Sequence, residues 1–351
     1  MTEIPPGVIA SWRRLAPETG RIVIACSGGP DSMALLLTAT QVFGRERPHV
    51  VTVDHRTRPD SATDAEFVLA EAAAAGVSAE IVTPDRPPGD LSEAAARDLR
   101  YAALAAAADS VSASAIATGH QADDQVETIL FRILRGTGLD GLAGIPERRP
   151  HKTATGAVEV IRPLLGTPRD ALAAYVTACG RTYRLDPTND TADYRRNRLR
   201  NEALPLLRDI IGPGVDTALR RLGGLAAEEA ANVEAELVEI HARLRDDADA
   251  SKAPGEVVWP ISVLAGIPEP RVRALLISVW NEQSWPRQGM TRAAWTAAAE
   301  VAQGERTALD LPGGVHVRQR RGLLRLTGPV GPTNASSSVD SGPAADYAPP
   351  V

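Results

Sequence analysis

The chain has 351 residues, more than one compact core of the usual domain size accommodates, so we expect two domains. Its two cysteines are too few for a disulfide framework or a cysteine-ligated metal site, and it shows neither a signal peptide nor an apolar run long enough to span a membrane. These features predict a cytoplasmic protein, and the formal net charge of −6 argues mildly against nucleic acid, although the arginines are unevenly placed.

Short β-branched runs alternate with longer alanine- and leucine-rich runs in the first part of the chain. We expect strands at residues 21–26, 49–55, 77–82 and 113–118, and helices at residues 31–43, 63–75, 91–108 and 121–134. Such alternation predicts an α/β fold with right-handed crossovers and a parallel sheet that is covered on both faces. Ligands bind at the carboxyl ends of the strands in such sheets. This singles out the loop that begins at Ser27 and the Gly119-His120 turn.

The pattern weakens beyond about residue 150. We expect helices at residues 167–179, 215–247, 270–280 and 291–303, a hairpin at residues 307–326, and a domain boundary at Pro213-Gly214. The prediction is a catalytic domain at residues 1–213 and a smaller, mostly helical domain that ends in a β-hairpin at residues 214–330. The remainder, residues 331–351, is rich in Gly, Pro, Ser and Ala and is predicted to be a disordered tail.

The loop Ser27-Gly28-Gly29-Pro30-Asp31-Ser32 is typical of an anion site between a strand and a helix. Its glycines allow backbone N–H groups to approach phosphate oxygens, and the helix N-terminus adds partial positive charge. It has neither the Lys-Ser/Thr pair of a Walker A loop nor a G-x-G-x-x-G pattern. A carboxylate beside phosphate needs a cation, so Asp31 predicts Mg²⁺. The alternative is a plain turn in which Asp31 or Ser32 only caps the helix.

This loop resembles the signature of the PP-loop ATP pyrophosphatases, in which the α-phosphate of ATP is attacked and pyrophosphate leaves. The resemblance implies a PP-loop ATPase domain of the adenine nucleotide alpha-hydrolase type. It also implies that residues 27–32 contact pyrophosphate and that Asp31 holds Mg²⁺. The loop alone does not distinguish among the enzymes of this group.

A second motif runs from Gly119 to Thr128 and carries three carboxylates within five residues, Asp123, Asp124 and Glu127. On a helix, Asp123 and Glu127 share a face. Acids in a first turn also complement the helix dipole, so a well-capped, solvated helix start would explain any one of them. It explains less well a histidine and three acids together at the carboxyl end of a strand. We therefore expect a role in holding magnesium and orienting substrate.

The motifs taken in order resemble the tRNA(Ile)-lysidine synthetase family over about residues 20–210. The resemblance rests on Gly119–Thr128 and on further motifs in chain order: Val53-Asp54-His55 with Arg58-Pro59, Ala96-Arg97 with Arg100-Tyr101, Arg135–Leu139, Gly141–Ile145, Arg162-Pro163-Leu164-Leu165, Asp186 with Asn189, and Arg196-Asn197-Arg198-Leu199-Arg200. The chain departs from the family at Arg56, where glycine is usual, which bears on the shape of that loop.

The resemblance implies ligation of L-lysine to C2 of the wobble cytidine, position 34, of an isoleucine tRNA with a CAU anticodon. An adenylated cytidine would form with release of pyrophosphate, and AMP would leave when lysine attacks. The implied cofactors are ATP and Mg²⁺. The implied catalytic residues are Asp31, Asp124 and Glu127, with Asp31 and Asp124 for the metal. The implied ATP contacts are Ser27, Gly28, Gly29, Pro30, Asp31, Ser32, His55, Arg97, Gly119 and His120. The implied contacts to tRNA or lysine are Asp123, Arg100, Arg196, Asn197, Arg198 and Arg200.

Arginines gather in two stretches that suit nucleic acid, because the guanidinium binds phosphate in a bidentate manner. The first contains Arg181, Arg184, Arg195, Arg196, Arg198, Arg200 and Arg208, and the second contains His316, Arg318, Arg320, Arg321 and Arg325. For the second, a solvated face balanced by glutamates is an equally good interpretation.

Two other functions stay open at this point. A PP-loop 2-thiolase would need sulfur-relay cysteines, and the chain has no C-x-x-C. A non-catalytic nucleotide-binding module would explain the Ser27 loop but not the acids or the arginines. The sequence predicts no membrane partner and leaves a homodimer open.

Overall fold

The computed structural model describes residues 2–56, 61–84, 93–184, 194–246 and 255–330. The chain divides into two compact units, Met1–Leu225 and Ala226–Val351. The division therefore falls within helix α10 (Val215–Asp246), later than the expected boundary at Pro213-Gly214, because this helix continues from one unit into the other. The expectations for Arg58-Pro59, Asp186, Asn189 and the tail lie outside the described residues.

The first unit is built on a six-stranded sheet with the order β3-β2-β1-β4-β6-β5. Its strands are β1 (Arg21–Ala25), β2 (Pro48–Val53), β3 (Ser78–Val82), β4 (Ala113–Ala117), β5 (Arg148–Lys152) and β6 (Ala157–Ile161). Its helices are α1 (Val8–Leu15), α2 (Pro30–Phe43), α3 (Ser61–Ala75), α4 (Glu93–Ser110), α5 (Ala122–Leu134), α6 (Leu139–Leu142) and α7 (Arg169–Ala178). Five strands are parallel and β5 is antiparallel at the edge, so the expected α/β alternation is confirmed and the β5–β6 hairpin is an addition.

The two faces of this sheet are covered by different helices, as the alternation of side chains along β1 requires. Ile22 and Ile24 pack with α1, α2 and α7 around the buried Trp12. Val23 faces the other way and packs with Leu104 of α4. The Trp12 indole donates a hydrogen bond of 3.1 Å to the Thr38 hydroxyl, so its polar atom is satisfied in the core.

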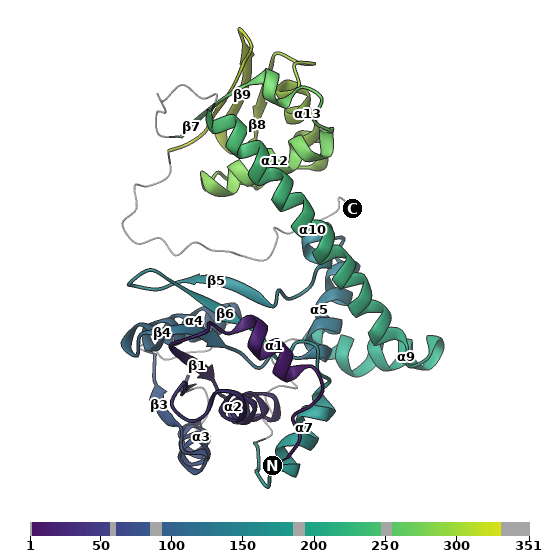
Figure 1. The fold of residues 1–351 in the computed structure, drawn as a ribbon. Helices are drawn as coiled ribbons and strands as arrows, with labels where there is room; N and C mark the ends of the chain where they lie inside the picture. Colours follow the sequence, from purple (N-terminus) through teal and green to yellow (C-terminus); the bar gives the residue numbers. More distant parts are fainter. Residues whose placement is uncertain (1, 57–60, 85–92, 185–193, 247–254, 331–351) are drawn as a thin grey trace. The chain divides into compact units, whose positions relative to one another are not determined.

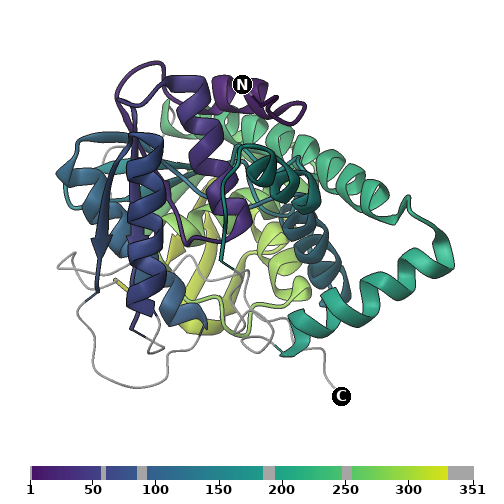
Figure 2. The same ribbon diagram turned by 90° about the horizontal axis from the view of Figure 1, so that it is seen from below.

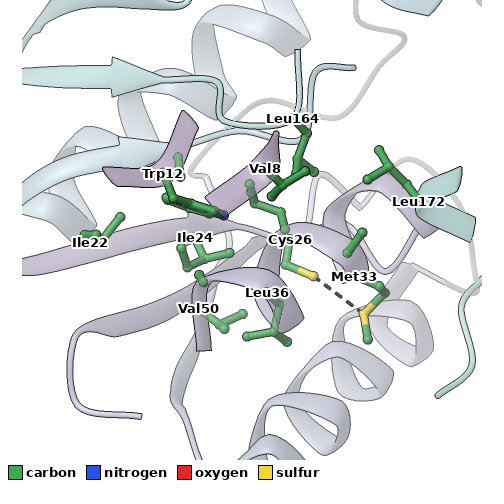
Figure 3. Close-up of a cluster of buried hydrophobic side chains, with 14 of the residues drawn as sticks. Val8, Trp12, Ile22, Ile24, Cys26, Met33, Leu36, Val50, Leu164 and Leu172 are labelled. Atoms are coloured by element: carbon green, nitrogen blue, oxygen red, sulfur yellow. Dashed lines mark hydrogen bonds between the residues drawn. The ribbon is translucent and has the colours of Figure 1, made fainter. Parts of the chain in front are cut away.

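Cys26 belongs to the first of these cores and is not exposed to solvent. Its sulfur lies 3.9 Å from the Met33 sulfur (Figure 3). The Ser32 hydroxyl is 3.6 Å from the same sulfur. Burial raises the pKa of the Cys26 thiol, which keeps it protonated and unreactive. Cys26 therefore fills space beneath the Ser27 loop, as a small apolar residue would.

A continuous helical segment follows in three parts: α8 (Tyr194–Arg198), the π-helical turn η2 (Leu199–Ala203) and α9 (Leu204–Ile211). Pro205 lies at the start of α9 and has no N–H group to donate to the preceding turn. The N–H of Leu204 donates to the carbonyl of Leu199, five residues back, which is the π-helical pattern. After α9 the chain reverses into α10, as Figures 1 and 2 show.

The second unit contains more sheet than the predicted hairpin. Its four strands are antiparallel in the order β7-β10-β9-β8: β7 (Glu256–Pro260), β8 (Ala308–Leu311), β9 (Val315–Arg320) and β10 (Leu323–Thr327). Its helices are α11 (Ile261–Leu264), α12 (Glu269–Glu282) and α13 (Arg292–Ala302). Trp280 makes edge-to-face contacts with Trp285 and Trp295 in the core. Within the described ranges, no helix is both long and apolar enough to cross a bilayer.

Candidate active site

The Ser27 loop connects β1 to α2 and is held open by its glycines. Gly28 has φ 83°, in the left-handed region, and a Cβ there would lie 3.3 Å from the Val68 side chain. Gly29 is the extended N-cap of α2, and Pro30 occupies the first turn, where its missing N–H is not needed. The Ser32 hydroxyl donates to the Gly29 carbonyl at 2.9 Å and accepts from the Ser27 N–H at 3.2 Å. The loop is thus braced from within, at the N-terminus of a 14-residue helix.

Asp31 lies in the first turn of α2 and is the electrostatically unusual residue of the loop. Its Oδ1 is buried and has no hydrogen-bond partner among the described residues, and its Oδ2 lies 3.7 Å from the Arg169 Nε. Burial raises the pKa of Asp31 to about 6, opposed by Arg169 and reinforced by Asp124. A carboxylate kept here without a partner for one oxygen needs a ligand to explain it.

Gly119 brings the end of β4 directly against this loop. A Cβ at Gly119 would lie 3.2 Å from the Asp31 carbonyl carbon and 3.2 Å from the Ser32 nitrogen. These are backbone atoms, so a side chain at this position would force the Asp31-Ser32 backbone to move by a few tenths of an ångström. The two motifs that the sequence singled out therefore meet at one point.

Replacing Gly119 by alanine is expected to weaken ATP binding by about tenfold, because the Asp31-Ser32 backbone must shift to admit the methyl group. Stability should fall by about 1–2 kcal/mol. Gly166→Ala is the matched control, since a Cβ at Gly166 meets nothing within 4 Å. Calorimetric titration with ATP and thermal denaturation measure both effects. Equal ATP affinity in the two variants would show that the approach of β4 does not shape the loop.

The acidic motif forms the first turn of α5, and two of its acids have structural partners. Gln121 and Asp124 form a capping box, in which the Gln121 N–H donates to Asp124 Oδ2 at 3.1 Å. Asp123 Oδ2 accepts from the backbone N–H of Arg169 at 3.0 Å and so caps α7. Burial raises the pKa of Asp124. The helix-capping interpretation is therefore correct in part, and it leaves Asp124 Oδ1 facing Arg200.

Glu127 is buried, with 2% of its surface exposed, and both its oxygens are occupied by Arg200. The Arg200 Nε donates to Oε1 at 2.5 Å and the Nη2 donates to Oε2 at 2.9 Å. The same Nη2 lies 3.8 Å from Asp124 Oδ1. The hydrogen bond to Glu127 raises the pKa of Arg200. Arg200 lies in η2, so the π-helical turn carries the guanidinium that reaches α5.

The other predicted site residues differ in their exposure and in the groups that they contact. His55 follows β2 at the same edge of the sheet, and the His120 Nδ1 is 2.9 Å from the Thr118 hydroxyl. Arg97 and Arg100 are exposed on α4. Arg198 is exposed and forms an ion pair with Glu202 at 2.8 Å.

Asn197 and Arg196, two residues that the resemblance implies contact the substrate, both lie in α8. Asn197 is half-buried, and its Nδ2 is buried without a hydrogen-bond partner among the described residues. The backbone of Arg196 belongs to α8, but its side chain is not among the described groups.

Several arginines of the first stretch stabilise the fold. Arg181 forms an ion pair with Glu71 at 3.3 Å. The Arg184 guanidinium lies over the Phe67 ring, and the Arg184 backbone N–H donates to the Gly28 carbonyl. Arg208 pairs with Asp216 at 2.8 Å. In the second stretch, Arg318 and His316 both contact Asp310, and Arg325 contacts Glu256.

Arg56 adopts φ 51°, a left-handed conformation that favours glycine. Its N–H donates to Asp54 Oδ1 at 2.8 Å, which braces the turn after β2. The departure of the sequence at this position therefore coincides with a backbone conformation that is strained for arginine.

Sequence reasoning missed Arg169 and Gln125. Arg169 is an isolated arginine in a helical first turn, and nothing in the sequence connects it to Asp31. Gln125 donates to the Ile145 carbonyl and accepts from the Ile145 N–H, and it thereby ties the glycine-rich segment 141–145 to α5. Its place in the Asp-Asp-Gln motif was the available signal.

The residues present fit a magnesium ion bound together with ATP phosphates. Asp31 supplies a buried carboxylate oxygen that no described residue pairs with, and Asp124 is a second carboxylate nearby. No group of three or more His, Cys, Asp or Glu side chains suited to a metal occurs among the described residues. Mg²⁺ is bound through one or two carboxylates plus phosphates, so it does not require such a group.

Comparisons with known proteins agree with this geometry. Residues 9–207 match the PP-loop domain family. The chain is 37% identical to the tRNA(Ile)-lysidine synthase of Salinispora arenicola, over 90% of this chain and 93% of that protein. It is 36% identical to the tRNA(Ile)-lysidine synthase of Salinispora tropica, over 94% of this chain and 99% of that protein.

Among solved structures, the U34-tRNA thiolase NcsA from Methanococcus maripaludis, with its [4Fe-4S] cluster, superposes with a TM-score of 0.51. The match covers 63% of this chain and 78% of that one at 16% identity, so it supports the fold alone. A shared thiolase activity is not implied, since this chain has two cysteines and Cys26 is buried in the core.

Proposed function

The chain belongs to the tRNA(Ile)-lysidine synthase family of PP-loop proteins, and from this premise we propose that it ligates L-lysine to the wobble cytidine of an isoleucine tRNA at the expense of ATP. The observation that carries the proposal is the meeting of the Ser27 loop with the acidic start of α5 at Gly119. The free thiols of Cys26 and Cys179 agree with the cytoplasmic location that we propose.

In the first step, the C2 oxygen of cytosine attacks the α-phosphorus of ATP and pyrophosphate leaves. The Ser27 loop and the N-terminus of α2 bind phosphate through backbone N–H groups. We assign Mg²⁺ to Asp31 with Asp124, and when bound it neutralises phosphate charge. The protein contributes position and charge here, because the nucleophile and the leaving group both belong to the substrates.

Arg200 is proposed to stabilise charge at the reacting phosphate, and Glu127 is proposed to orient it. Glu127 occupies Nε and Nη2, which leaves Nη1 without a hydrogen bond among the described residues. A buried carboxylate that fixes a guanidinium in this way is a positioning group. The catalytic role that the resemblance implies for Glu127 is therefore proposed to be indirect, since Arg200 binds both its oxygens.

In the second step, the ε-amine of lysine attacks C2 and AMP leaves with the former C2 oxygen. Among the described residues, Asp124 Oδ1 is paired only with Arg200, at 3.8 Å, so Asp124 is a candidate for the lysine ammonium as well as for Mg²⁺. Attack requires a neutral amine, and a buried acidic site supplies both attraction and a place for the proton to go.

The function is tested by following products. The protein incubated with ATP, Mg²⁺, labelled lysine and an isoleucine tRNA transcript is expected to release AMP and pyrophosphate and to label the RNA. A transcript with uridine at the wobble position should stay unlabelled, because uracil lacks the amino group that makes the C2 oxygen of cytosine electron-rich. ADP as product, or turnover that needs a sulfur donor in place of lysine, would contradict the proposal and favour the thiolase alternative.

A further inference from the structure

Three arginines gather on the α4 face of the sheet, next to the strand that carries Gly119. Arg162 directly follows β6, which pairs with β4. Val160 of β6 packs in the core against α4, and Arg149 of β5 is its cross-strand partner, so Arg149 faces the same side. Arg97 projects from α4 over the Tyr101 ring, with its guanidinium carbon 5.3 Å from the ring centre.

Arg162 is a buried cation without a counter-ion in the part of the chain that the structure describes. Only 2% of its surface is exposed. Its Nη1 donates to the Pro146 carbonyl at 2.6 Å, and its Nε is buried with no hydrogen-bond partner among the described residues. No carboxylate among the described residues pairs with it. A buried charge of this kind is costly unless an opposite charge compensates it.

The surroundings add positive charge to the arginine that already lacks compensation. Burial lowers the pKa of Arg162, the Tyr101 side chain opposes this, and Arg97 and Arg149 lower it further. The pKa of His151, which lies beside Tyr101, is lowered by burial and by Arg149, so a positive charge on this imidazole is disfavoured. Arg97 and Arg149 therefore lie close enough to Arg162 to act on its charge, beside an Nε–H that has no partner among the described residues.

We propose that Arg97, Arg149 and Arg162 form a binding site for a phosphate group of the substrate, which we assign to the RNA backbone beside the target nucleotide. Arg97 and Arg149 would contact the phosphate, and Arg162 would contribute charge and its Nε–H from beneath. Guanidinium groups suit phosphate because their donors match its oxygens. This inference rests on the proposed function, since it takes tRNA as the substrate.

The position in the sheet favours RNA over ATP as the source of this phosphate. β6 is two strands from β1, which carries the Ser27 loop, and adjacent strands are about 5 Å apart, so the sites are separated by roughly 10 Å. The ATP phosphates have their own glycine loop and helix N-terminus. An RNA strand that delivers a base to the loop has phosphates on both sides of that base.

Arg149→Gln in the full chain is expected to weaken binding of the isoleucine tRNA transcript about tenfold, and to reduce the slope of log Kd against log salt by about one. ATP affinity should not change. Lys152→Gln is the matched control. This substitution removes the same charge from the same strand, but Lys152 lies on the opposite face of β5 from Arg149. It should keep the parent tRNA affinity and slope. Fluorescence anisotropy across a salt series measures both.

Arg97→Gln is the second variant, since Arg97 is exposed and its loss does not threaten the fold. It should repeat the loss of tRNA affinity and the smaller salt slope of Arg149→Gln. Inorganic phosphate should raise the melting temperature of Arg149→Gln less than that of Lys152→Gln. Equal tRNA affinity in Arg149→Gln and Lys152→Gln would overturn the site, and a loss of ATP affinity with unchanged tRNA binding would overturn its assignment to RNA. A parent that binds tRNA with this salt dependence but incorporates no lysine would refute the proposed function and leave the site standing.

Discussion

Replacing Asp31 by asparagine is expected to lower turnover by at least about 10³-fold while making the folded protein more stable. The side chain keeps its volume and its place in α2, but it loses the charge that we propose binds Mg²⁺ beside the phosphates. Release of AMP and pyrophosphate and incorporation of labelled lysine measure the loss. ATP binding in the presence of Mg²⁺ should weaken, whereas binding without the metal should change little.

The gain in stability follows from the raised pKa of Asp31, which burial shifts to about 6. The folded state binds a proton at Asp31 more tightly than the unfolded chain does, because the pKa of an aspartate in an unfolded chain is about 4. The free energy of unfolding therefore falls as the pH rises from about 4 to about 6, and it stays lower above that range. Asp31→Asn removes this effect. The free energy of unfolding of the variant should therefore exceed that of the parent by about 1–3 kcal/mol at neutral pH, and by little near pH 4.

Asp170→Asn is the control for both halves of this prediction. Asp170 is also a carboxylate in the first turn of a helix, α7, but it is exposed. Its loss should cost a few tenths of a kcal/mol through the helix dipole and leave turnover unchanged. Thermal denaturation at neutral pH and near pH 4 measures the difference in stability between the variants, since Tm shifts by roughly 2–4 °C per kcal/mol for a unit of this size. Full activity of Asp31→Asn would disprove the assignment of the metal to this residue.

The parts of the fold that the sequence predicted are those with local signals. The first four strands and their helices have apolar runs, and glycines end several of them, such as Gly44 and Gly76 with positive φ. β5 has no such signal, because its five residues are Arg, Arg, Pro, His and Lys. It is a strand only because β6 offers it an unpaired edge, and a proline is tolerated there.

In the site, too, the features with a local sequence signal were predictable and the contacts between distant residues were not. The Ser27 loop and the acids of α5 were visible as short motifs, but their meeting at Gly119 depends on the order of strands in the sheet. Arg200 and Glu127 are 73 positions apart, and their contact depends on the π-helical turn before Pro205. Arg169 reaches Asp31 from a third helix. Contacts of this kind follow from tertiary structure and have no counterpart in a local pattern.

Replacing Arg200 by glutamine is expected to produce the largest loss of stability of any single exchange at the site. It leaves the Glu127 carboxylate buried and without its cation, and breaking a buried ion pair in this way costs about 3–5 kcal/mol. Turnover should also fall by roughly 10²–10³-fold, because the donor proposed to face the phosphate is lost. Urea denaturation and the lysine incorporation assay measure the two effects separately.

Arg198→Gln is the matched control on the neighbouring turn. Its ion pair with Glu202 spans one helical turn, and both partners are more than half exposed. Such a pair contributes about 0.5 kcal/mol or less, so the stability of this variant should stay close to that of the parent. A similar loss of stability in both variants would mean that charge on this helix matters in general and that the Glu127 pairing does not.

The double variant Arg200→Gln with Glu127→Gln separates the structural role of the pair from its chemical role. Two neutral amides can hydrogen-bond to each other in place of the ions, so much of the lost stability should return. Turnover should not return with it, because no guanidinium then faces the reacting phosphate. Glu127→Gln alone keeps Arg200 but weakens its orientation, so we expect a smaller fall in kcat, with the KM for ATP little changed. If the double variant regained both stability and activity, Arg200 would be a purely structural residue. The charge at the phosphate would then have to come from elsewhere, and Arg169 is the nearest cation to Asp31 that the site offers.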